Sequence, residues 1–182
     1  MDKLELKDIA PYLPYKVKVQ ITEGYYAGKV KLLSGVQYDG LLNLGKGGRF
    51  GFTEREYHQV KLLLRPMSDL TKEITHNGET FVPINKLSEL FDFSIAANDE
   101  YRDSNFSFDP DTDEWFFHID KYFNGIVYTS TSEGMRGHYG EFRLSFTVMN
   151  KIVQKLCEWQ IDFQDLIGRG LAININTLNN GK

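Results

Sequence analysis

The amino-acid sequence predicts an α+β protein built in two parts. A small N-terminal antiparallel β module, barrel-like and of SH3-like form, is expected over residues 1–66. An α+β region that ends in a long amphipathic helix is expected over residues 67–182, and one continuous compact domain is the alternative organisation. Three observations lead to this prediction: a polar–apolar alternation near the N-terminus, glycine-bounded turns between the alternating runs, and an apolar stripe with helical spacing near the C-terminus.

The β module is expected to begin with two strands. Lysine and glutamine alternate with valine and isoleucine over residues 16–22, and the same period of two recurs over residues 29–32. In the second run Val30 and Leu32 are predicted to face away from the lysines. The segment between the runs, residues 23–28, reads as a glycine-bounded turn that carries two tyrosines.

Three further β segments complete the predicted module, at residues 34–38, 40–44 and 60–65. Thr53, followed three residues later by Glu56, has the pattern of a capping box and predicts a helical turn before the last strand. Short strands, tight turns and this helical turn together indicate a small twisted barrel.

The second part is expected to mix hairpins, loops and helices. Asn77 and Gly78 form the strongest short-range hairpin signal in the chain, since a type I′ turn needs two residues with positive φ. Pro83 suits the first position of a helix. Residues 92–114 are acidic and lack periodicity, which predicts a long loop; strands follow within residues 116–131, and the glycines after them predict another loop.

The last predicted element is an amphipathic helix. It is expected to begin near Ser145 or Thr147 and to end at Gly168 or Gly170, with a break near residue 161 as an alternative. The apolar stripe of this helix either packs on the core or forms the seam of a homodimer. The stripe spans fewer than two heptads, which is short for a coiled coil and favours packing on the core. The apolar positions, spaced by three and four residues, are Met149, Ile152, Leu156, Trp159, Phe163 and Leu166.

The net charge of −4 is unevenly distributed. Residues 1–66 carry eleven basic and seven acidic side chains, whereas residues 67–140 carry five basic and fourteen acidic ones. No apolar run approaches the length of about 18 residues that a membrane span needs, so no membrane partner is expected. The lone Cys157 excludes an intrachain disulfide, and the N-terminus has no secretory leader pattern, which together predict a cytoplasmic protein.

The candidate binding residues are basic and aromatic side chains of the β module. If the first two strands pair, their four lysines are expected to share one face beside the tyrosines of the turn. Ammonium groups beside exposed aromatic rings suit single-stranded nucleic acid, and the same composition suits protein recognition. A plain solvated lysine face is the alternative. The proposed set is Lys16, Lys18, Tyr25, Tyr26, Lys29 and Lys31, with Lys46 and Arg49 on a glycine-rich loop.

A run of carboxylates gives a weak candidate metal site. Asp109, Asp111 and Asp113 stand at alternate positions and Asp120 falls twelfth, as in a calcium-binding loop. Glu114 occupies the sixth position, where that loop needs glycine for its turn. A solvated acidic turn is therefore expected, and a metal-dependent enzyme that uses this loop is the alternative.

No catalytic residue and no cofactor are expected. Residues 40–46 match the first seven positions of a phosphate-binding P-loop, but Gly47 stands where a Ser or Thr must hold Mg²⁺. His118 and Asp120 would share one face of a strand, a pairing that alternation often produces by chance. Cys157 has no neighbouring feature that would make its thiol reactive.

Three segments, residues 4–15, 64–74 and 156–173, resemble short uncharacterised proteins encoded by phages and prophages of gut anaerobes. The resemblance implies a small accessory protein made in the cytoplasm of an infected or lysogenic bacterium, and it assigns no activity or site residues. The leading expectation is a non-enzymatic protein that binds a host or phage protein, for example to inhibit a host or defence protein. Nucleic-acid binding is the first alternative.

Overall fold

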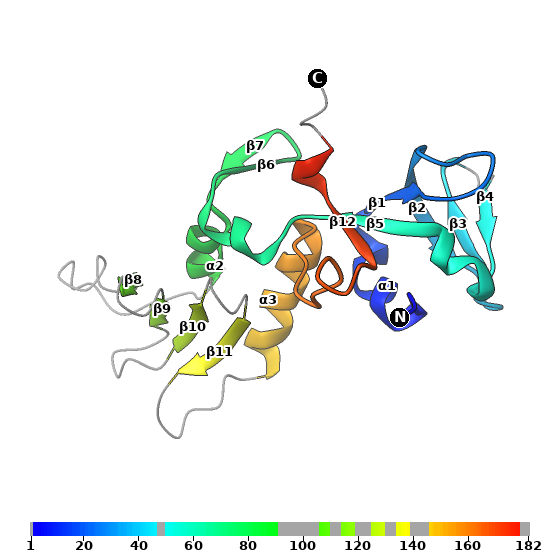
Figure 1. Ribbon diagram of the computed structural model, residues 1–182. Helices are drawn as coiled ribbons and strands as arrows, with labels where there is room; N and C mark the ends of the chain where they lie inside the picture. The colour runs from blue at the N-terminus through cyan, green and yellow to red at the C-terminus, as the bar shows by residue number, and fades with distance from the viewer. Residues whose placement is uncertain are drawn as a thin grey trace. The chain divides into compact units, whose positions relative to one another are not determined.

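The computed structural model describes residues 2–46, 50–90, 106–109, 114–118, 125–129, 134–138 and 146–178 (Figure 1). The chain is a mixed α+β protein, as predicted, and divides into two compact units. The first unit combines Met1–Pro66 with Leu156–Lys182, and the second comprises Met67–Lys155. The first unit therefore draws on both ends of the chain.

An open six-stranded sheet forms the first unit. Its strands lie in the order β12–β5–β1–β2–β3–β4. Strands β1 to β4 form successive antiparallel pairs, β5 returns antiparallel to β1, and β12 is parallel to β5 (Figure 1). The bounds are β1 (Lys18–Ile21), β2 (Val30–Val36), β3 (Leu42–Leu44), β4 (Phe50–Phe52), β5 (Val60–Leu64) and β12 (Ala172–Asn174).

The predicted closure into a barrel is wrong. A closed barrel has no edges, whereas this sheet has β4 at one edge and β12 at the other. The outer edge of β5 is occupied by β12, whose register pairs Ala172 with Leu62 and Asn174 with Leu64. Closing the barrel through β5 would need the outer edge of β5 to pair with another N-terminal strand. The C-terminal strand β12 occupies that edge instead.

Short helical elements precede, interrupt and follow the strands of this unit. The predicted capping box before β5 is confirmed, since the Thr53 backbone N–H donates to Glu56 Oε2 at 2.9 Å at the start of a 3-10 helix. The helical elements are α1 (Leu6–Ile9), η1 (Ala10–Tyr15), η3 (Glu54–Gln59) and η6 (Ile175–Thr177).

The C-terminal segment completes the core of the first unit. Ile161 and Leu166 are fully buried, and the hydroxyl of buried Tyr12 donates to the Ile161 carbonyl oxygen at 2.9 Å. Ile161 also forms a parallel bridge with Arg65, directly after β5. Val17 just before β1 and the buried apolar residues of the sheet complete this core, and those of the sheet include Val19, Ile21, Leu33, Leu42, Leu44, Leu62, Leu63 and Leu64.

The predicted C-terminal helix begins where expected, but it is shorter than predicted and does not end the chain. Helix α3 spans Phe146–Glu158, and the chain then turns and continues to β12. Gln160 has φ 61°, and the backbone bonds from Ile161 N to Leu156 O and from Gln160 N to Cys157 O form a Schellman motif. The break considered near residue 161 therefore falls at the end of α3.

The apolar stripe of the predicted helix continues beyond α3 without helical structure. Trp159 and Leu166 follow the helix and are buried, as is Leu156 within it. Their spacing of three and four residues reflects burial of a looped segment rather than one helix face. These three side chains are buried, and a homodimer formed through the helix stays a prediction.

The second unit begins with η4 (Met67–Thr71) and the hairpin of β6 (Ile74–His76) and β7 (Glu79–Phe81). The predicted turn is confirmed, with φ 52° at Asn77 and φ 86° at Gly78. Helix α2 (Pro83–Leu90) then begins at Pro83, as expected.

A four-stranded antiparallel sheet of order β11–β10–β9–β8 also belongs to the second unit. β8 lies in a region predicted as loop because alternation there lasts only four residues, and β11 lies in the glycine-rich stretch also predicted as loop. Both loop predictions are wrong at these positions. The bounds are β8 (Phe106–Asp109), β9 (Glu114–His118), β10 (Gly125–Thr129) and β11 (Gly134–His138).

Candidate binding surface

Two consecutive β-turns join β1 to β2. The Ala27 N–H donates to the Gly24 carbonyl oxygen at 3.1 Å, and the Lys29 N–H donates to the Tyr26 carbonyl oxygen at 3.1 Å. Gly28 has φ +81°, a conformation that L side chains rarely adopt, at the third position of the second turn. This geometry places Tyr25 and Tyr26 at the two central positions of the first turn.

The two tyrosines form a row of aromatic rings with a residue of β4. The ring centroids of Tyr25 and Tyr26 are 5.0 Å apart at an interplanar angle of 85°, and those of Tyr26 and Phe50 are 4.9 Å apart at 84°. Such edge-to-face contacts are favourable because the positive edge of one ring meets the negative face of the next. Tyr25 is 92% exposed, whereas Tyr26 is 39% exposed.

Two lysines lie over the rings of this row. Lys29 Nζ is 4.9 Å from the centroid of Tyr26, and Lys31 Nζ is 5.0 Å from the centroid of Phe50. Both distances are within the range of a cation–π attraction. Tyr25, Tyr26, Lys29, Lys31 and Phe50 together are called the aromatic–lysine cluster below.

Phe50 lies on the same face of the sheet as two buried leucines. Buried Leu33 on β2 pairs with buried Leu44 on β3, and Leu44 pairs with Phe50 on β4, so the three side chains share one face. Gly45 has φ +77°, and a Cβ built there would lie 3.8 Å from the Phe50 ring and 4.0 Å from Lys31 Cδ. The chain therefore passes close to the cluster at this glycine.

The predicted common face of the four lysines is wrong. The register pairs Lys18 with Leu32, Val19 with Lys31 and Gln20 with Val30. Paired residues share a face, so Lys18 lies with Val30 and Leu32 and opposite to Lys31.

The face of Lys18 is the more exposed one. Val30 is 42% exposed and Leu32 is 43% exposed, although the alternation predicted that they face away from the lysines. Lys16 precedes β1, with φ 52° and an exposed side chain. The structure thus brings together only part of the predicted set, namely Tyr25, Tyr26, Lys29 and Lys31.

Of the two basic residues predicted on the glycine-rich loop, the structure describes only Lys46. Lys46 follows Gly45 and is exposed, whereas Arg49 lies outside the described residues. Phe50 was missed because β4 was not predicted. The alternating Phe50 and Phe52 around Gly51 were the available signal for a strand with aromatic residues on one face.

The candidate metal ligands are largely outside the described residues. Asp109 is the last residue of β8, whereas Asp111, Asp113 and Asp120 are not among the residues that the structure describes. Within the described part of the chain, no group of three or more His, Cys, Asp or Glu side chains is placed to hold a metal ion.

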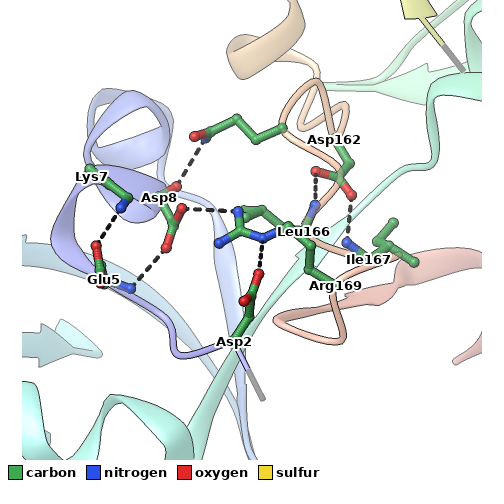
Figure 2. Close-up of polar contacts among 9 residues, drawn as sticks. Asp2, Glu5, Lys7, Asp8, Asp162, Leu166, Ile167 and Arg169 are labelled. Carbon is green, nitrogen blue, oxygen red and sulfur yellow. Dashed lines mark hydrogen bonds and ion pairs between the residues drawn. The ribbon is translucent and has the colours of Figure 1, made fainter.

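A second polar cluster joins the two chain ends of the first unit (Figure 2). The Arg169 guanidinium donates to Asp2 Oδ2 at 2.7 Å and to Asp8 Oδ1 at 3.2 Å. Asp8 is 2% exposed and also accepts from the Glu5 N–H at 2.9 Å. This cluster stabilises the fold, because Arg169 joins the C-terminal segment to Asp2 and Asp8 near the N-terminus.

The other buried carboxylate of the first unit holds a turn. Asp162 accepts from the N–H groups of Leu166 at 2.8 Å and Ile167 at 2.6 Å (Figure 2). Burial raises the pKa of Asp162, and the two N–H donors oppose part of that rise. Burial also raises the pKa of the Cys157 thiol to about 12, which keeps this buried side chain in its unreactive thiol form.

An open cavity of about 370 Å³ lies against α1. Residues 3–7, Glu54 and Tyr57 line it, and Lys7 Nζ is paired with Glu5 Oε2 at 2.6 Å. Its wall mixes lysine and glutamate, so it does not favour a ligand of one charge. The aromatic–lysine cluster is the better candidate, because it combines the exposed Tyr25 ring and the exposed Lys29 with the half-buried Lys31 and Phe50 at one place on the surface.

Comparison of the chain with protein-family models, with curated proteins and with solved structures gave no significant match. None of the described helices combines the length and the apolar character that crossing a membrane requires. Fold and surface together define a mixed α+β protein that presents an aromatic–lysine cluster at the margin of an open sheet.

Proposed function

We propose that the chain is a non-enzymatic binding protein that recognises another protein through the aromatic–lysine cluster. The observation that carries this proposal is the ring of Tyr25, 92% exposed yet held edge-to-face against Tyr26. Rigid exposed tyrosines lose little conformational entropy on binding and are enriched in protein interfaces. Phe50 and the stems of the lysines extend the apolar contact area around that ring.

The biological setting of the proposal comes from the sequence. The resemblance to short phage and prophage proteins supports an accessory protein that acts in the bacterial cytoplasm, with inhibition of a host or defence protein as its mode of action. The helical turn η3 directly before β5 supports the finer description of the N-terminal strands as an SH3-like module, even though the sheet is open.

The proposal is tested by capture followed by affinity measurement. The protein is immobilised, a host lysate is passed over it, and a stoichiometric partner is identified, purified and titrated by calorimetry. Tyr25→Ala is expected to weaken the affinity by about tenfold or more, as expected for a central aromatic contact. Tyr38→Ala is the matched control, because Tyr38 is equally exposed in the turn at the other end of β2. Equal effects of the two variants, or no protein partner, would contradict the proposal.

Nucleic acid is the second candidate partner. An exposed tyrosine ring and two neighbouring ammonium groups are the groups that stack on bases and attract phosphates. Capture of nucleic acid alone from the lysate, with binding that weakens steeply as salt rises, would favour this alternative. The metal-dependent enzyme depends on Asp111, Asp113 and Asp120, which lie outside the described residues, and stays a prediction.

A further inference from the structure

We infer that the protein partner presents an extended segment with two carboxylates at alternate positions, which bind Lys29 and Lys31. This inference rests on the proposed function and names the chemistry of its partner.

Lys29 and Lys31 are two residues apart along an extended segment, so their side chains lie on the same face of the sheet. The antiparallel ladder extends to Lys29, whose carbonyl oxygen accepts from the Ile21 N–H at 3.0 Å, and β2 begins at the next residue. Side chains two residues apart on a strand are separated by about 6.5–7 Å. An extended partner segment presents its own alternate side chains at the same spacing, so two carboxylates match the two ammonium groups in register.

The charges of the two lysines are available to such a partner, Lys29 from an exposed position and Lys31 from a half-buried one. Within the described residues, neither Lys29 nor Lys31 forms an ion pair, and each ammonium group lies over a ring. A ring does not neutralise a cation, so each ammonium group still pairs with a carboxylate that approaches from solvent. The N-terminal 66 residues also carry a net positive charge, which favours an acidic partner in the encounter.

The geometry favours an acidic protein segment over a nucleic-acid strand. A phosphate chain needs a continuous run of cations, but Lys18 lies on the opposite face of the hairpin. Tyr26 and Phe50 are each engaged by a neighbouring ring and a lysine, which leaves Tyr25 as the one broadly exposed ring of the cluster. Two carboxylates and one aromatic contact fit this surface without further cations.

A random peptide library displayed on phage particles tests the inference against the immobilised full-length protein. Enriched peptides are expected to carry Asp or Glu at alternate positions. Synthetic copies should bind about tenfold more weakly, or worse, to the double variant K29E/K31E, and Lys18→Glu should change the affinity by less than about twofold. The double variant K29Q/K31Q keeps the lysine stems in part and should also weaken binding, and circular dichroism checks that each variant is folded.

The outcomes separate the inference from the proposed function. Enrichment of neutral or basic peptides, no enrichment, or binding that K29E/K31E leaves unchanged would overturn the inference. If the partner captured from lysate is lost with Tyr25→Ala but retained by K29E/K31E, the proposed function stands and the inference fails. Tighter binding of an oligothymidylate than of any selected peptide, lost in K29E/K31E, would replace the acidic segment with nucleic acid.

Discussion

Single residues of the first unit show how its buried carboxylates hold chain segments together. Asp8 is held by Arg169 and the Glu5 N–H, and Asp162 is held by two backbone N–H groups. Buried carboxylates that are fully hydrogen-bonded hold segments together, and leaving one unpaired costs about 1–3 kcal/mol. Asp162 caps the turn that follows α3, where the chain reverses.

The raised pKa of Asp162 predicts a pH-dependent stability. The pKa of Asp162 in the folded state lies above its ordinary value of 3.8. At any pH between 3.8 and that folded-state pKa, the folded state therefore binds more protons than the unfolded state. The contribution of this residue to the free energy of unfolding therefore falls as the pH rises through that window. Asp162→Asn removes the titration.

Urea unfolding of both proteins over a series of pH values measures this effect. The free energy of unfolding of the wild type minus that of Asp162→Asn should decrease as the pH rises above 3.8 and then become constant. A difference that is flat, or that increases with pH, would show that burial does not raise the pKa of this carboxyl.

At the scale of elements, local patterns predicted turns and the starts of helical turns better than they predicted the faces of strands. The Asn77–Gly78 hairpin and the capping box at Thr53 depend on two or four neighbouring residues, and both are confirmed. The common lysine face depended on the register between two strands. A change of one residue in the effective length of the loop would exchange the two faces of β2.

The end of helix α3 gives a prediction at this scale. Gln160 adopts the left-handed conformation at the C′ position of a Schellman motif, where glycine pays no steric penalty. Gln160→Gly is therefore expected to stabilise the protein by roughly 0.5–1 kcal/mol in urea unfolding. Gln154→Gly, at an exposed position within α3, should instead destabilise it by about 1 kcal/mol. Destabilisation by both variants would contradict the left-handed geometry at Gln160.

At the scale of the whole molecule, the first unit is assembled from segments far apart in the sequence. β12 pairs with β5, and Ile161 bridges to Arg65. No periodicity or turn signal specifies such a pairing, because it depends on contacts between residues separated by about a hundred positions in the sequence. For this reason the sequence predicted a closed N-terminal barrel and a terminal helix, whereas the C-terminal segment provides an edge strand of the sheet.

Removal of residues 156–182 is expected to unfold the first unit. The deletion takes away β12 and the buried side chains of Ile161 and Leu166, and it exposes the edge of β5. Heteronuclear NMR should then show loss of dispersed amide signals from β1 to β5. A synthetic peptide of residues 156–178, added in excess, should restore them. A truncated chain that keeps these signals and unfolds cooperatively would contradict this role of the C-terminal segment.

The position of β12 also determines when the first unit can be completed during synthesis. Strands β1 to β5 leave the ribosome first, but their sheet lacks its last strand until residues 172–174 have been translated. Throughout the synthesis of Met67–Lys155, the edge of β5 therefore has no partner from its own unit. An unpaired strand edge is a site for association between chains, so the nascent protein is most exposed to misassembly while Met67–Lys155 is being made.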